Sequence, residues 1–145
     1  MSKSGSSTRY DIRYHFVWIP KYRKRLLTRV RQEYLKYLLR RLAAEFDFAI
    51  VEMEVMVDHV HLFVEAPPRH SPAKLMNVIK SITAREMFAK FPEVRKVLWG
   101  GEFWGDGYYV GTVGDKVTAE AVRRYIRGQR PQSFPHDGAA PDAPL

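Results

Sequence analysis

Hydrophobic and polar residues recur along the first half of the chain with two different periods. Residues 9–20 are rich in aromatic and β-branched side chains, which predicts a strand that ends at Pro20. Residues 29–46 carry apolar side chains at helical spacing, which predicts an amphipathic helix packed on a sheet. Residues 48–56 and 59–66 are predicted to form two strands joined by a tight turn.

The second half of the chain contains the same kinds of element. Residues 72–90 are predicted to form a second helix, with Ser71 as its N-cap and Pro72 at its first position. A stretch rich in tryptophan and glycine follows and is expected to be irregular. Residues 108–113 are predicted to form a fourth strand. A last helix, capped by Asp115 or Thr118, is expected to run through about Gly128.

The order of these elements, β-α-β-β-α-β-α, predicts an α+β fold. It favours a ferredoxin-like split βαβ sandwich, in which an antiparallel sheet has its helices on one face, with one helix added at the C-terminus. The length of 145 residues suits a single domain, expected at residues 9–130. Residues 1–8 are expected to be flexible, and the proline-rich residues 131–145 are expected to be disordered.

Positive charge is concentrated near the N-terminus. The net charge is +8, and residues 1–45 hold 12 of the 24 Lys and Arg residues but only 3 of the 16 Asp and Glu residues. A localised basic surface attracts phosphate backbones and releases their counterions, which favours nucleic-acid binding. An acidic partner or a solvated helix face would account for the charge as well. The densest run consists of Lys21, Arg23, Lys24 and Arg25.

Several classes of protein are disfavoured by what the sequence lacks. It has no cysteine, which excludes disulfides, thiolate metal sites and cysteine nucleophiles. The N-terminal residues lack the apolar core of a signal peptide, and no apolar stretch approaches the roughly 18 residues of a membrane span. Glycine-rich phosphate-binding motifs are missing, so no nucleotide cofactor is expected. These features predict a cytoplasmic protein with no membrane partner.

The sharpest local signal is the sequence His59-Val60-His61. Residues i and i+2 of a strand point to the same face, so both imidazoles can converge on one metal ion. Two imidazoles are too few for a closed structural site, which requires four protein ligands. The pattern therefore predicts an open site, or a third ligand from elsewhere, and imidazole suits several divalent ions. Alternatively, one histidine is a satisfied core residue and the other is exposed.

The last predicted helix offers two further candidates. Tyr125 and Gln129 are spaced i, i+4 and therefore lie on one face of it. The amide oxygen of Gln129 is capable of metal ligation. The phenol of Tyr125 is a poor nucleophile at neutral pH, because the pKa of tyrosine is near 10. Taken alone, a tyrosine in an amphipathic helix is more often a packing residue.

The assembled pattern resembles the small single-tyrosine transposases of the insertion sequence 200/605 group, which belong to the His-hydrophobe-His (HUH) nuclease superfamily. The similarity extends over residues 9–129, and the spaced combination is more specific than any one motif. One departure is Val57, where relatives often have proline. The matching residues are 14–18 (YHFVW), 21–23 (KYR), 53–62 (MEVMVDHVHL), 98–101 (LWGG), Trp104, Tyr125, Ile126 and Gln129.

This resemblance implies a DNA transposase. Its metal-dependent site would be formed by residues of the sheet together with residues of the C-terminal catalytic helix. His59, His61 and Gln129 would hold a divalent ion, Mg²⁺ or Mn²⁺, and Tyr125 would be the nucleophile. The attack of Tyr125 on single-stranded DNA would leave a 5′-phosphotyrosine, which a 3′-hydroxyl group later reseals without a nucleotide cofactor.

The resemblance also implies partners. Members of the group are prokaryotic, act on single-stranded DNA with hairpins near the element ends, and form homodimers in which the tyrosine helix of one subunit can complete the site of the other. The sequence leaves open whether the site is assembled within one chain or between two. A protein of this kind would work at the nucleoid. Besides the basic run at residues 21–25, candidate DNA contacts on the second helix are Lys74, Lys80 and Arg85.

Three other interpretations remain open at the level of sequence. A non-catalytic nucleic-acid-binding module on a ferredoxin-like fold would explain the charge but would give the histidines, Tyr125 and Gln129 no common role. A host-domesticated tyrosine nuclease that processes repeated palindromes would have the same site residues. Metal-dependent hydrolysis of a small molecule is the weakest interpretation, because no general base stands out.

Overall fold

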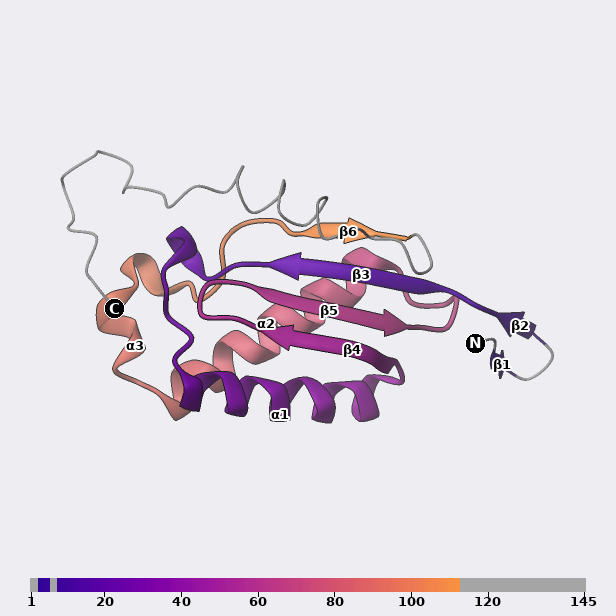
Figure 1. The fold of residues 1–145 in the computed structure, drawn as a ribbon, viewed down its shortest axis with the longest axis horizontal. Coiled ribbons are helices and arrows are strands. Elements are labelled where there is room, and N and C mark those ends of the chain that lie inside the picture. The colour runs from indigo at the N-terminus through magenta and orange to yellow at the C-terminus, as the bar shows by residue number, and fades with distance from the viewer. Residues whose placement is uncertain (1–2, 6–7, 113–145) are drawn as a thin grey trace.

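A computed structural model describes residues 3–5 and 8–112 of the chain. Its main unit is a four-stranded sheet with two long helices (Figure 1). The elements of this unit are β3 (Arg13–Trp18), α1 (Arg29–Phe46), β4 (Ala49–Val55), β5 (Val60–Glu65), α2 (Pro72–Lys90) and β6 (Tyr109–Gly111). The strand order is β4-β5-β3-β6 and every pairing is antiparallel, so the predicted ferredoxin-like α+β fold is confirmed.

The core lies between α1, α2 and one face of the sheet. Alternate residues of β3 and β5 are fully buried there, because successive side chains of a strand point to opposite faces. Removing each such side chain from water contributes about 1.5–3 kcal/mol to folding. The sheet supplies Phe16, Trp18, Val60, Leu62 and Val64, α1 supplies Leu35, Leu38, Leu39 and Leu42, and α2 supplies Met76, Ile79 and Met87.

Both long helices have identifiable end signals. At the start of α2, the hydroxyl of Ser71 accepts a hydrogen bond of 3.1 Å from the backbone N–H of Lys74, and Pro72 occupies the first turn, as predicted. Helix α1 ends at Phe46 and is followed by its C-cap, Asp47, which adopts a left-handed conformation with φ of 59°. These ends leave short connections to the neighbouring strands, which keeps the helices on the sheet.

The structure departs from the sequence-based boundaries in three places. The strand predicted over residues 9–20 divides into β2 (Thr8–Tyr10) and β3. Strand β2 pairs with β1 (Lys3–Gly5), in a segment that the sequence predicted to be flexible. The tryptophan- and glycine-rich stretch contains short helical turns, α3 (Val94–Val97) and η2 (Trp99–Gly101). The predicted last helix, Tyr125, Gln129 and residues 131–145 lie outside the described residues.

The basic run begins with another short helical turn, η1 (Lys21–Arg23). As for membrane association, none of the helices described here has both the length and the apolar character that a crossing requires.

Candidate functional site

The two histidines of the His-x-His motif lie side by side at one end of the central strand. His61 belongs to β5, and His59 is the last residue of the turn that joins β4 to β5. Their ring centroids are 5.1 Å apart. Val60, between them, is fully buried in the core, whereas His61 points to the opposite sheet face. We call this the histidine face, defined by His15, His61 and Phe63.

The environment of His61 keeps its imidazole neutral. Burial lowers the pKa of His61 to about 4, and the neighbouring His59 and His15 act in the same direction. At neutral pH the ring therefore carries a nitrogen lone pair. Neutral imidazole is the form that binds a metal ion, so the local electrostatics suit ligation.

The ring of His59 is held by its neighbour in sequence. Its Nδ1 lies 2.9 Å from Oδ1 of Asp58, within hydrogen-bonding distance. The other carboxylate oxygen, Oδ2, lies 3.7 Å from Nε of Arg23 in η1. Asp58 is thus placed between a candidate metal ligand and a residue of the basic run.

A third imidazole, that of His15, lies next to the pair, and sequence reasoning missed it. His15 is on β3, whose Val17 pairs with His61, and its ring centroid is 5.4 Å from that of His61. Nε2 of His15 is buried and has no hydrogen-bond partner within the described part of the chain. Burial lowers the pKa of His15, and Glu52 opposes this effect. Only the strand register, which sequence periodicity does not supply, brings His15 beside His61.

The donor set of His59 and His61 fits an incomplete metal site. Within residues 3–5 and 8–112, no three His, Cys, Asp or Glu side chains are arranged to hold a metal ion together. His59 and His61 supply two nitrogen donors, which leaves positions for further ligands and for substrate. The predicted third ligand, Gln129, and the predicted nucleophile, Tyr125, lie beyond the described residues.

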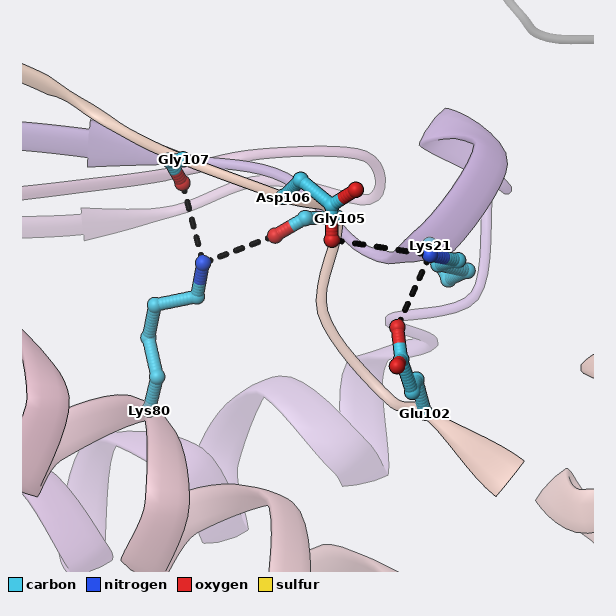
Figure 2. A network of polar contacts seen from close by, with 6 residues as sticks. All are labelled: Lys21, Lys80, Glu102, Gly105, Asp106 and Gly107. Carbon is cyan, nitrogen blue, oxygen red and sulfur yellow. Dashed lines mark hydrogen bonds and ion pairs between the residues drawn. The ribbon is translucent and has the colours of Figure 1, made fainter. Parts of the chain in front are cut away.

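Two of the predicted DNA-contacting lysines make contacts within the protein (Figure 2). Nζ of Lys21 donates a hydrogen bond of 2.8 Å to Glu102 and lies 3.7 Å from a carboxylate oxygen of Asp106. Nζ of Lys80 donates to the carbonyl oxygens of Gly105 and Gly107, at 2.7 and 2.9 Å. Both lysines therefore anchor the segment that leads into β6.

The other predicted DNA contacts differ in exposure. The side chain of Lys24 is buried, with 7% of its surface exposed, and Arg23 lies beside Asp58. In contrast, Arg25 at the end of the run and Lys74 and Arg85 on α2 are exposed. Of the seven candidates, these three are best placed to reach a phosphate backbone.

The chain is similar to known transposases over nearly all of its length. Residues 8–129 match the family model described as "Transposase IS200 like". The ISDra2 transposase TnpA of Deinococcus radiodurans is 35% identical over 127 residues, which cover 88% of this chain and 90% of that protein. The transposase for insertion sequence element IS200 of Salmonella typhimurium is 34% identical over 127 residues, with coverages of 88% and 82%.

A solved structure shows the same fold. The crystal structure of a candidate transposase from Deinococcus radiodurans R1 superposes with a TM-score of 0.83 at 35% sequence identity, and covers 90% of this chain and 99% of that one. Family match, sequence identity and fold agree with one another. This chain therefore belongs to the IS200-like transposase family.

Proposed function

We propose that the chain, as a transposase, cleaves and rejoins single-stranded DNA at the hairpin-bearing ends of its element. The observation that carries this proposal is the pair of adjacent imidazoles, His59 and His61, at the end of a central strand in a member of this family. The low pKa of His61, about 4, keeps that ring available for a divalent ion.

The metal site consists of His59, His61 and the amide oxygen of Gln129. A divalent ion, Mg²⁺ or Mn²⁺, supplies Lewis acidity when bound, which orients the scissile phosphate and stabilises its developing charge. No nucleotide cofactor is needed, because the phosphoester is transferred and not hydrolysed.

Tyr125 is the nucleophile. Its phenol loses a proton, and its oxygen attacks the phosphorus in line with the leaving 3′-oxygen. The bond between phosphorus and the 3′-oxygen breaks, and the 3′-oxygen takes up a proton. The products are a 5′-phosphotyrosine and a free 3′-hydroxyl group, and the reverse reaction with another 3′-hydroxyl group reseals the strand.

A covalent adduct tests this chemistry directly. End-labelled single-stranded DNA with the element's own ends is incubated with the protein and Mg²⁺ or Mn²⁺, and the products are separated on a denaturing gel. We expect a protein–DNA band that requires the ion and is absent in Tyr125→Phe, which lacks only the hydroxyl group. DNA binding without a band under either ion would favour the non-catalytic binding module.

The active unit is a homodimer in which the tyrosine of one subunit completes the site of the other. Mixing two inactive variants, Tyr125→Phe and His61→Ala, tests this arrangement. Assembly between subunits pairs the intact histidines of one variant with the intact tyrosine of its partner, so the adduct should reappear. If each site is assembled within one chain, the mixture stays inactive.

The host-domesticated alternative shares all these residues and differs in its substrate. If the protein cleaves repeated palindromes in preference to the DNA that flanks its gene, the host-domesticated alternative is favoured.

A further inference from the structure

We propose that Asp58, held by Arg23, is a positioning residue for the metal ligand His59. In this arrangement Asp58 keeps the ring proton of His59 on Nδ1, so that the lone pair on Nε2 is presented to the ion. The inference rests on the proposed metal site and concerns a carboxylate and an arginine to which that proposal gives no role.

The hydrogen bond between Asp58 and His59 is short and partly shielded from water. Oδ1 of Asp58 and Nδ1 of His59 are 2.9 Å apart, and the two side chains are 19% and 17% exposed. An ionised carboxylate has no proton to donate, so the hydrogen of this bond belongs to the imidazole. A neutral ring that carries its proton on Nδ1 has its only lone pair on Nε2.

The backbone around Asp58 is fixed on both sides. The N–H of Met56 donates to the carbonyl oxygen of His59 at 2.8 Å and closes the turn between β4 and β5. The N–H of Leu27 donates to the carbonyl oxygen of Val57 at 3.0 Å, which ties the turn to the connector before α1. Asp58 therefore stays beside His59 without contributions from DNA or an ion.

Arg23 is brought to Asp58 by an unusual backbone conformation. Tyr22 and Arg23 both have positive φ, 61° and 50°, which non-glycine residues adopt only when their surroundings compel it. The N–H of Arg23 donates to the carbonyl oxygen of Pro20 at 2.8 Å and stabilises this turn. The guanidinium Nε then lies 3.7 Å from Oδ2 of Asp58, the oxygen on the other side from His59.

This chain of contacts has the form of a carboxylate–histidine–metal arrangement. Metal-binding histidines usually donate their second ring N–H to a carboxylate or carbonyl group, which fixes the tautomer and raises the basicity of the ligating nitrogen. Loss of such a partner typically weakens metal binding by about 10–100-fold. Arg23 would thus serve the metal site, although its position in the basic run suggests a phosphate contact.

The basic run provides a matched control. Arg23→Gln and Arg25→Gln each remove one positive charge from the same segment, but only Arg23 lies against Asp58. We expect Asp58→Ala to weaken Mn²⁺ binding, measured by electron paramagnetic resonance on the protein without DNA, by about 10–100-fold. Arg23→Gln should act in the same direction with a smaller effect, and Arg25→Gln should leave Mn²⁺ affinity unchanged.

A spectroscopic measurement separates positioning from general loss of structure. Long-range ¹H–¹⁵N spectra of the ion-free protein should show the His59 proton on Nδ1 in the wild type and a mixture of tautomers in Asp58→Ala. Asp58→Asn keeps an oxygen that can accept the bond, and should retain the wild-type tautomer with weaker Mn²⁺ binding. An unchanged backbone amide spectrum of the remaining residues shows that a variant is folded.

Several outcomes would overturn the inference. One is a wild-type protein in which the His59 proton lies on Nε2, or in which no Mn²⁺ is bound. Another is an Asp58→Ala variant that binds Mn²⁺ as tightly as the wild type. A third is an equal loss of Mn²⁺ affinity in Arg23→Gln and Arg25→Gln. Neither measurement depends on DNA cleavage. If no protein–DNA adduct forms but Asp58→Ala weakens Mn²⁺ binding as expected, only the proposed function is rejected. If the adduct forms but Asp58→Ala binds Mn²⁺ as tightly as the wild type, only this inference is rejected.

Discussion

The indole Nε1 of Trp104 donates a hydrogen bond of 2.9 Å to the hydroxyl of Thr83, and both side chains are buried. The Thr83 hydroxyl in turn donates to the carbonyl oxygen of Ile79 at 2.6 Å. This relay attaches the segment before β6 to α2. The backbone bond from Gly105 N–H to the carbonyl oxygen of Ile19, 2.8 Å long, attaches the same segment to the end of β3.

Replacement of Thr83 by valine should destabilise the fold. Valine removes the acceptor of the Trp104 N–H, and leaving a buried donor unpaired costs about 1–3 kcal/mol. Urea denaturation gives the change in the free energy of unfolding. Thr83→Ser keeps the hydroxyl and loses one methyl group, so it should cost only about 0.8 kcal/mol. Equal losses in the two variants would show that the hydroxyl is not needed.

Lys80→Met should lower stability, and any loss of DNA binding should follow from that. The ammonium group of Lys80 bonds two carbonyl oxygens, and each bond contributes about 0.5–1.5 kcal/mol net. We therefore expect a fall of about 1–3 kcal/mol in the free energy of unfolding, measured by urea denaturation. A stable Lys80→Met variant with weaker DNA binding would show instead that Lys80 contacts DNA, as the sequence suggested.

Arg25→Gln and Arg85→Gln should weaken DNA binding without affecting stability. Both side chains are exposed. A lost phosphate contact reduces the magnitude of the slope of log affinity against log salt by about 0.7 on single-stranded DNA and by about 0.9 on a duplex stem. Fluorescence anisotropy with the element's hairpin at several salt concentrations measures this slope. Arg40→Gln, at an exposed position of α1 outside the proposed contacts, serves as the charge-matched control and should leave the slope unchanged.

The imidazoles of His15, His59 and His61 should contribute unequally to metal binding. His61→Ala removes a proposed ligand and should lower Mn²⁺ affinity at least about tenfold. His15→Asn should change it little, because the described His, Cys, Asp and Glu side chains form no three-ligand site that includes His15. Electron paramagnetic resonance titration of the two variants compares these affinities. A loss in His15→Asn equal to that in His61→Ala would make His15 a ligand.

The elements with strong periodic patterns were predicted well from sequence. Helix α1 matches the predicted range of 29–46, and α2 matches 72–90, because their apolar spacing and the Ser71 cap are local signals. The order of strands followed from the alternation of elements. The pairing of β1 with β2 was not predicted, because short polar strands have no distinctive period.

The adjacency of the candidate ligands could be predicted, whereas their surroundings could not. His59 and His61 are two residues apart, so strand geometry alone places them together. Lys21 and Glu102 are 81 residues apart, and only the folded chain reveals that this lysine faces a carboxylate. His15 beside His61 likewise depends on strand register. The roles of Tyr125 and Gln129 remain predictions, since both lie outside the described residues.

The position of β5 links the candidate site to global stability. This strand is hydrogen-bonded on both edges, by β3 and by β4, and its alternate residues are fully buried. Amides of such a strand exchange with solvent mainly when the whole domain opens. An ion held through His61 is therefore lost on global unfolding, and at 100 times its dissociation constant it adds about 2.7 kcal/mol to the free energy of unfolding. Chelation of the ion should accordingly lower the melting temperature of the entire domain, and not only loosen the turn that bears His59.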